Sequence, residues 1–189
     1  MKNNHQFLDS CWNKGENMNT KNNKRRRESV AKIEKAFVGL LQERDINKIT
    51  VTDICNLTGF NRSTFYANFL DIYDLADKLR KKLEDDFSAL FSDYDYFNER
   101  TGALKMFTHI KENQIFYKTY FKLCYDSKHL ITIYDTKRAE IELDNANIKY
   151  HIEFFRNGLN AIIKMWLEGG CVEAPEEMAE ILKQEYKGR

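Results

Sequence analysis

The chain has 189 residues, of which 42% are hydrophobic and 31% are charged, and its formal net charge is +1. This composition is typical of one or two globular domains, and the lack of any run of roughly eighteen apolar residues excludes a membrane-spanning helix. The four cysteines have neither metal-ligand nor paired spacing, and they are Cys11, Cys55, Cys124 and Cys171. We therefore expect a cytoplasmic protein with free thiols, no bound metal and no other cofactor.

Charge is distributed unevenly along the chain. From Lys21 to Leu70 there are ten Lys and Arg against five Asp and Glu, whereas from Asp71 to Arg189 there are eighteen against twenty-two. A basic N-terminal third on an acidic remainder is typical of a polyanion-binding head carried by a body that the polyanion repels. A moderate basic excess is equally common on a solvated surface, so charge alone does not decide between the two.

The first residues, 1–23, are rich in Asn and Lys without hydrophobic periodicity, which predicts a disordered tail. Met18 is an alternative start of the chain, because recognisable patterns begin only after it. Five cations then occur within seven residues, at Lys21, Lys24, Arg25, Arg26 and Arg27. They either contact DNA, by lying along its phosphates or by entering a minor groove, or they form a solvated segment before the first helix.

A first amphipathic helix is predicted from about Glu28 to Gln42, because Ile33, Phe37, Leu40 and Leu41 recur there at helical spacing. This helix presents one apolar face to a small core. Ile46, Ile49, Phe60, Phe65 and Phe69 are expected to complete that core as packing groups.

Two short helices separated by a glycine turn come next. Thr50 or Thr52 can cap the first of them through a hydroxyl, and Gly59 supplies a residue that tolerates a positive φ. Asn61 or Ser63 then opens the second helix. This order of cap, turn and cap indicates a helix-turn-helix motif.

The pattern around the motif is longer than a lone helix-turn-helix requires. The residues that extend it are Phe37, Thr50 to Ile54, Gly59, Thr64 to Tyr66 and Phe69. In their types and spacing, residues 25–90 resemble the TetR family of transcriptional regulators. The resemblance implies an all-α fold: a three-helix DNA-binding domain at 24–70, a connector helix at 71–91, and a C-terminal regulatory and dimerisation domain at 92–189.

The resemblance also implies which side chains contact DNA. Arg62 and Ser63 are the candidates for base edges, since Arg can bind guanine O6 and N7 with two donors, and Asn61 is a weaker candidate. Phosphate contacts are implied for Thr50, Thr52, Thr64, Tyr66 and Asn68, together with the cations Lys24, Arg25, Arg26 and Arg27.

Two positions depart from the family pattern. Ile72 occupies a position where the family commonly has a phosphate-binding Lys, and Ala67 occupies one where larger residues are frequent. We hypothesise that the basic segment Lys21 to Arg27 compensates for the missing cation.

The remainder of the chain is predicted to be helical. The expected helices are Asp71 to Phe91, Gly102 to Asn113, Ile115 to Tyr125, Ala146 to Glu168, and one beginning at Pro175. Ser92 to Asn98 interrupts the pattern and marks the expected domain boundary. Leu130 to Asp135 is β-branched but has no visible partner strand, so we assign it to helix or loop.

The C-terminal helices resemble a particular TetR subgroup. Tyr150 to Leu159, Lys164 to Cys171 and Pro175 to Met178 are similar to the C-terminal domain of a subgroup that includes the regulator of dihydroxyacetone kinase operons. In TetR-like proteins the last two long helices of each protomer form a four-helix bundle, which implies a homodimer here. The implied interface residues are Ile148, Ile152, Phe155, Leu159, Ile162, Trp166, Met178, Ile181 and Leu182.

Aromatic side chains are frequent in the second half of the chain, and most of them are expected to be core. Those that could line a pocket for a small apolar or aromatic ligand are Phe107, Phe116, Tyr120, Phe121, Tyr125 and Phe154. The sequence therefore predicts a dimeric, sequence-specific regulator that binds a near-palindromic double-stranded operator, acts as a repressor and is modulated by a ligand. The alternatives are an activator whose C-terminal domain binds a protein co-regulator, and a non-specific nucleic-acid-binding protein.

An enzyme is not expected. Cys55 occupies a small-residue position in the core of the motif, where a thiol acts as a small hydrophobe. No phosphate-binding loop, glycine-rich fingerprint or pair of carboxylates stands out in the sequence.

Overall fold

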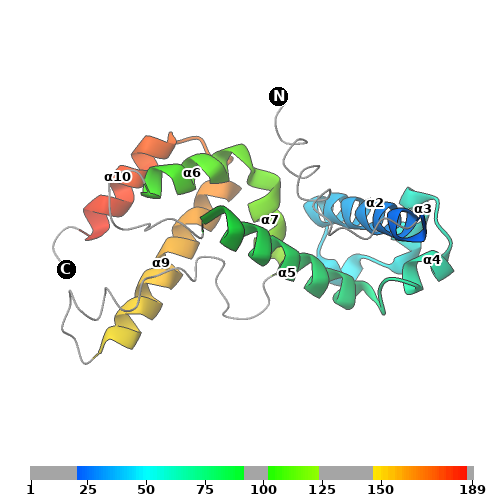
Figure 1. Ribbon diagram of the computed structural model, residues 1–189. Helices are drawn as coiled ribbons and strands as arrows, with labels where there is room; N and C mark the ends of the chain where they lie inside the picture. The colour runs from blue at the N-terminus through cyan, green and yellow to red at the C-terminus, as the bar shows by residue number, and fades with distance from the viewer. Residues whose placement is uncertain (1–20, 92–101, 124–146, 187–189) are drawn as a thin grey trace. The chain divides into compact units, whose positions relative to one another are not determined.

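A computed structural model describes residues 21–91, 102–123 and 147–186, and every regular element in these ranges is a helix (Figure 1). The predicted all-α fold is therefore confirmed. Within the described ranges, no helix combines the length and the apolar content that a membrane crossing requires.

The chain divides into two compact units. The N-terminal unit comprises Met1–Asp86 and Lys118–Tyr125, and the C-terminal unit comprises Phe87–Tyr117 and Asp126–Arg189.

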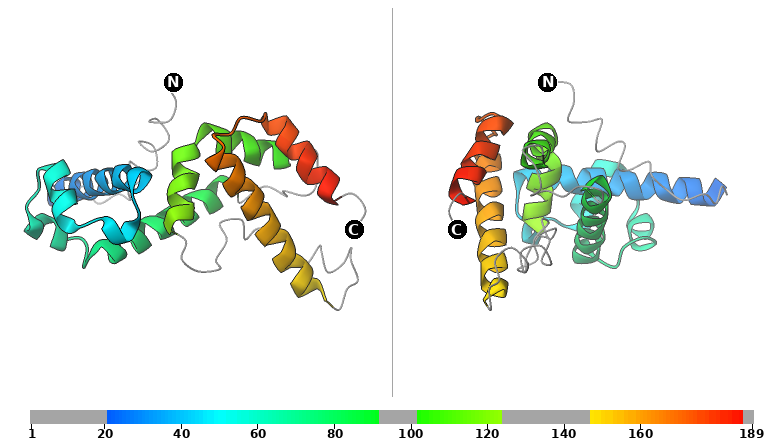
Figure 2. Two further views of the ribbon diagram at one scale, coloured as in Figure 1. Left: turned by 180° about the vertical axis from the view of Figure 1, so that it is seen from behind. Right: turned by 60° about the vertical axis from the view of Figure 1, so that its left-hand side comes forward.

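The N-terminal unit is built from α2 (Lys21–Glu43), the short 3-10 helix η1 (Ile46–Lys48), α3 (Val51–Thr58), α4 (Arg62–Tyr66) and most of α5 (Ile72–Phe91). In this unit α3 packs against α2, and α4 packs against α3 (Figure 2).

The first helix begins earlier than the sequence predicted. It starts at Lys21 rather than at Glu28, so the basic segment forms its first turns. Lys and Arg are good helix formers, and neither Gly nor Pro occurs between Lys21 and Val38, so the helix can extend without an apolar stripe. The remaining part of the predicted tail, residues 1–20, lies outside the described residues.

The core of the N-terminal unit follows the helical period. Ile33, Phe37 and Leu41 recur every four residues on α2 and are fully buried. From α5, the buried side chains in this unit are Ile72, Leu75, Ala76, Leu79 and Leu83, which recur at helical spacing. Each fully buried large apolar side chain contributes roughly 1.5–3 kcal/mol relative to exposure, so these two stripes hold α2 and α5 in place.

The C-terminal unit contains α6 (Gly102–Glu112), the first part of α7 (Gln114–Leu123), α9 (Ile148–Glu168) and α10 (Pro175–Tyr186). Here α6 and α10 lie side by side (Figure 1). The Phe107 and Trp166 rings meet edge to face with centroids 5.5 Å apart, which ties α6 to α9. Ser92 to Asn98 and Leu130 to Asp135 lie outside the described residues.

Candidate nucleic-acid interface

The start of α3 is fixed by a capping box. The Thr50 hydroxyl accepts a hydrogen bond from the Asp53 amide at 3.2 Å, and the Thr50 amide donates to Asp53 Oδ2 at 2.9 Å. The hydroxyl also donates to Asp53 Oδ2 at 2.7 Å. Hydrogen bonds from the Thr50 side chain and backbone, with a smaller contribution from Arg44, hold the pKa of the Asp53 carboxyl below its ordinary value. Of the two threonines predicted as caps, Thr50 therefore has this role.

The turn between α3 and α4 depends on Gly59. Its φ of 73° lies in the left-handed region, and its N–H donates to the Cys55 carbonyl at 2.9 Å to close α3. The buried Thr58 hydroxyl donates to the Ile54 carbonyl at 2.7 Å and accepts from the Phe60 amide at 3.3 Å. These bonds satisfy the backbone of the turn and fix the direction in which α4 begins.

The second helix of the motif, α4, is short and is anchored by one aromatic side chain. Phe65 is fully buried and packs against Phe69, with ring centroids 5.5 Å apart. Arg62, Ser63 and Tyr66 are exposed on the same helix. A five-residue helix has little stability of its own, so Phe65 and the preceding turn determine where these polar side chains point.

Arg62 is connected to the preceding helix. Its Nη2 donates a hydrogen bond to the Thr52 hydroxyl at 2.8 Å. The residue predicted to contact bases and a residue predicted to contact phosphate are thus brought together at the exposed side of the motif.

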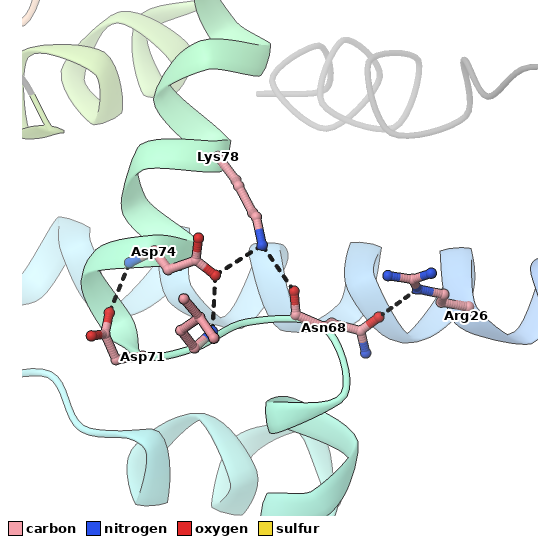
Figure 3. A network of polar contacts seen from close by, with 6 residues as sticks. Arg26, Asn68, Asp71, Asp74 and Lys78 are labelled. Carbon is pink, nitrogen blue, oxygen red and sulfur yellow. Dashed lines mark hydrogen bonds and ion pairs between the residues drawn. The ribbon is translucent and has the colours of Figure 1, made fainter.

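The C-terminal end of α4 is held by a polar network around Asn68 (Figure 3). Arg26 Nε, from the first turns of α2, donates to Asn68 Oδ1 at 3.0 Å, while Asn68 Nδ2 donates to the Thr64 carbonyl at 2.9 Å. Lys78 Nζ, from α5, donates to the Asn68 carbonyl at 3.1 Å. Two cations on separate helices therefore bind Asn68, two residues after the end of α4.

Lys78 also organises the start of α5. Its Nζ lies 2.8 Å from Asp74 Oδ2, an oxygen that also accepts from the Leu70 amide at 2.9 Å, and the Asp71 side chain accepts from the Asp74 amide at 2.8 Å (Figure 3). The hydrogen bond from Lys78, followed by that from the Leu70 amide, keeps the pKa of Asp74 below its ordinary value. Lys78 was not among the predicted site residues, although its spacing of four residues from Asp74 was a signal for this pair.

The remaining predicted DNA contacts lie on the same unit. Lys24, Arg25 and Arg27 are exposed on the first turns of α2, and Asn61 precedes α4 without a hydrogen bond from its side chain to the helix. Thr64 is half-buried, and Ala67 is exposed directly after α4.

The predicted pocket residues are divided between the two units. In the C-terminal unit, Phe107 and Phe116 are buried whereas Phe154 is exposed. Tyr120 is buried and Phe121 half-buried, and both belong to the N-terminal unit, where Tyr120 donates a long hydrogen bond of 3.4 Å to Glu84. Tyr125 lies outside the described residues.

Most of the predicted dimer-interface residues are covered within one protomer. The buried ones are Ile152, Phe155, Leu159, Trp166, Met178 and Leu182, whereas Ile148 and Ile162 are half-buried and Ile181 is exposed. A second apolar stripe on α9, formed by Tyr150, Phe154, Ala161 and Met165, faces away from this core and is exposed. No side chain from this stripe was among the predicted interface residues.

The chain is similar to known transcriptional regulators in sequence and in fold. Residues 98–188 match the family described as the transcriptional regulator C-terminal region, which is a TetR family domain. The HTH-type dhaKLM operon transcriptional activator DhaS of Lactococcus lactis subsp. lactis (strain IL1403) is 32% identical over 102 residues, a match that spans 53% of this chain and 53% of that protein.

The fold is shared with a solved structure, the TetR transcriptional regulator from Streptococcus agalactiae 2603V. The TM-score is 0.66 at 20% identity, and the superposition covers 87% of this chain and 96% of the other. The family match identifies residues 98–188 as a TetR-type C-terminal region of a transcriptional regulator, and the chain shares its fold with the Streptococcus agalactiae regulator.

Proposed function

We propose that the protein binds double-stranded operator DNA sequence-specifically, as a homodimer, and thereby regulates transcription. The observation that carries the proposal is the geometry of α4: Phe65 anchors it, and Arg62 and Ser63 lie exposed beside one another. A helix that follows such a turn inserts into the major groove, where base pairs present distinct patterns of donors and acceptors.

The exposed side chains of the motif divide into two groups. Arg62 can donate two hydrogen bonds to guanine O6 and N7, and Ser63 and Asn61 can bond to neighbouring base edges. Thr52 and Tyr66, with Lys24, Arg25 and Arg27 on α2, are suited to phosphate contacts that fix the register on the duplex. Thr50 and Asn68 are occupied by internal bonds, so any phosphate contact they make adds to a structural role.

Selection from a pool of random duplexes at physiological salt tests the proposal. The purified full chain is expected to enrich one near-palindromic sequence, and Arg62→Ala is expected to relax the preference at one position of each half-site. Binding that shows no sequence enrichment, and whose affinity depends only on salt, would support the non-specific alternative instead.

A homodimer is supported by the exposed stripe on α9. Phe154 is 63% exposed and Met165 is 68% exposed, which is unusual for side chains of this size on one helix face. Ile181 of α10, a predicted interface residue, is also exposed. We propose that a second copy of the chain covers this apolar surface.

The direction of regulation is a separate question. Repression relieved by a small apolar or aromatic ligand in the C-terminal domain was the first expectation, and buried aromatic residues such as Phe107 and Phe116 are consistent with it. Activation is the second candidate, because the relative from Lactococcus lactis is named a transcriptional activator. Transcription in vitro from a promoter carrying the selected sequence distinguishes them: the transcript level falls on adding a repressor and rises on adding an activator.

A further inference from the structure

Arg62 and Thr52 form a pair that joins the two helices of the motif. Among the described residues, the Thr52 hydroxyl is the acceptor that the Arg62 guanidinium meets, at 2.8 Å from Nη2. Both side chains are exposed, and ten residues separate them in the chain. The contact therefore depends on the geometry of the turn at Gly59.

The bond restricts a side chain that would otherwise be free to rotate. An exposed Arg has several rotatable bonds, and ordering its side chain at a binding site reduces the binding free energy that the contact yields. Holding Nη2 on a fixed hydroxyl removes part of that cost before binding. The guanidinium has five N–H donors, so one bond to Thr52 leaves enough of them for a bidentate contact with a base.

The Thr52 hydroxyl retains a donor of its own. A hydroxyl has one proton and two lone pairs, and here a lone pair accepts from Arg62. Its proton can therefore be donated to a phosphate oxygen without breaking the bond to Arg62. A backbone contact and a base contact can be made at the same time through this one hydroxyl.

We propose that Thr52 determines base specificity by positioning Arg62, and that it does so while its hydroxyl donates to the neighbouring phosphate. This inference rests on the proposed function, since it concerns how the same surface distinguishes one base pair from another. Thr52 is here a positioning residue, and Arg62 is the residue that touches the base.

The test compares Thr52→Val with Thr52→Ser in the full chain. Val keeps the β-branched shape and removes the hydroxyl, whereas Ser keeps the hydroxyl. The affinities of both variants are measured for the duplex selected by the wild type and for its single-base variants at the position where Arg62→Ala relaxes preference. Thr52→Val is expected to lower the preference for the selected base by about twofold to tenfold, and Thr52→Ser to retain it.

A double variant separates positioning from direct contact. If Thr52 acts through Arg62, adding Thr52→Val to Arg62→Ala should not change the preference at that position any further. Equal unfolding midpoints of Thr52→Val and wild type establish that the fold is intact, and Thr52→Ala provides a second hydroxyl-free variant.

Two results would contradict this inference and leave the proposed function intact. One is an unchanged base preference in Thr52→Val. The other is an equal loss of affinity for all duplexes, as expected if the hydroxyl contacts only a phosphate. If the wild type itself enriches no sequence, the proposed function fails first, and the inference fails with it.

Discussion

At the scale of single residues, the two threonines at the start of α3 differ in role although they lie two positions apart. Thr50 has its hydroxyl within the capping box, and Thr52 has its hydroxyl directed to Arg62. The Thr-x-x-Asp spacing from Thr50 to Asp53 is a capping-box signal in the sequence, whereas Thr52 is followed at the same spacing by Cys55. The contact of Thr52 with Arg62 was not predictable, because it depends on the path of the turn rather than on a local pattern.

Thr50→Ala is predicted to lower the free energy of unfolding by about 1 kcal/mol, because it leaves the amide of Asp53 without its cap. Urea denaturation followed by circular dichroism measures the change. Thr52→Ala is the matched control and should stay within about 0.5 kcal/mol of the wild type, since its hydroxyl caps nothing. Equal losses in the two variants would contradict the assignment of the cap.

His109 gives the C-terminal unit a predicted dependence on pH. Burial lowers the pKa of His109 from 6.5 to about 4, and its Nδ1 lies 2.6 Å from the Tyr117 hydroxyl. Between these pH values the unfolded chain binds the proton and the folded chain does not. The contribution of His109 to the free energy of unfolding is therefore fully present above pH 6.5 and is lost as the pH falls toward 4. Unfolding midpoints at pH 7 and pH 5 should differ less in His109→Gln than in the wild type. The same pH dependence in both proteins would show that other groups cause it.

At the scale of secondary-structure elements, apolar periodicity was the reliable signal. It predicted the helix from Asp71 to Phe91 to within one residue of the observed start of α5 at Ile72, and Pro175 was correctly placed at the start of α10. The start of α2 was missed because Lys21 to Arg27 contains no apolar residue, so periodicity gives no information there. Helix propensity, which favours Lys and Arg, is what extends α2 through this segment.

Gly59→Ala is predicted to destabilise the N-terminal unit by about 1–2 kcal/mol, because its φ of 73° is unfavourable for any residue with a Cβ. Gly39→Ala is the matched control in the same unit. Gly39 lies within α2 with nothing within 4 Å of an added Cβ, so the substitution should stabilise the protein by about 0.5–1 kcal/mol. Denaturant midpoints that shift in the same direction for both variants would refute the role given to the turn.

An ion pair between α2 and α5 supports a second prediction for these elements. Lys82 Nζ lies 2.9 Å from Glu34 Oε2, and Glu34 is buried. Lys82→Met should cost about 1–3 kcal/mol of stability, because it leaves a buried carboxylate without its partner. The exposed neighbour Lys81 provides the control, Lys81→Met, which should have little effect. In a double-mutant cycle, Glu34→Met combined with Lys82→Met should cost less than the sum of the single changes.

At the scale of the whole molecule, α9 shows why an exposed apolar face is harder to predict than the fold. One face of this helix carries Ile152, Phe155, Leu159, Ile163 and Trp166, and these side chains are buried within the protomer. The opposite part carries Tyr150, Phe154 and Met165, which are exposed. Both stripes recur at helical spacing, so periodicity identifies two apolar faces without indicating which one turns inward. That choice is set by packing against α6 and the rest of the unit.

The exposed face leads to a prediction about assembly. If a second copy covers it, the wild type should sediment as a dimer at micromolar concentration, and Phe154→Ser and Met165→Ser should each shift it toward the monomer, because each removes large apolar area from the contact. Leu57→Ser is the matched control: Leu57 is 61% exposed but belongs to the N-terminal unit, so its substitution should leave the association state unchanged.

The same variants connect assembly to DNA binding. A monomer contacts one half-site, so Phe154→Ser should bind a near-palindromic duplex more weakly than the wild type while retaining the base preference within each half-site. A dimer that persists in both α9 variants, as judged by sedimentation equilibrium, would exclude this face as the interface. In that case the predicted residues that remain accessible in the protomer, Ile181 foremost, become the surface to substitute next.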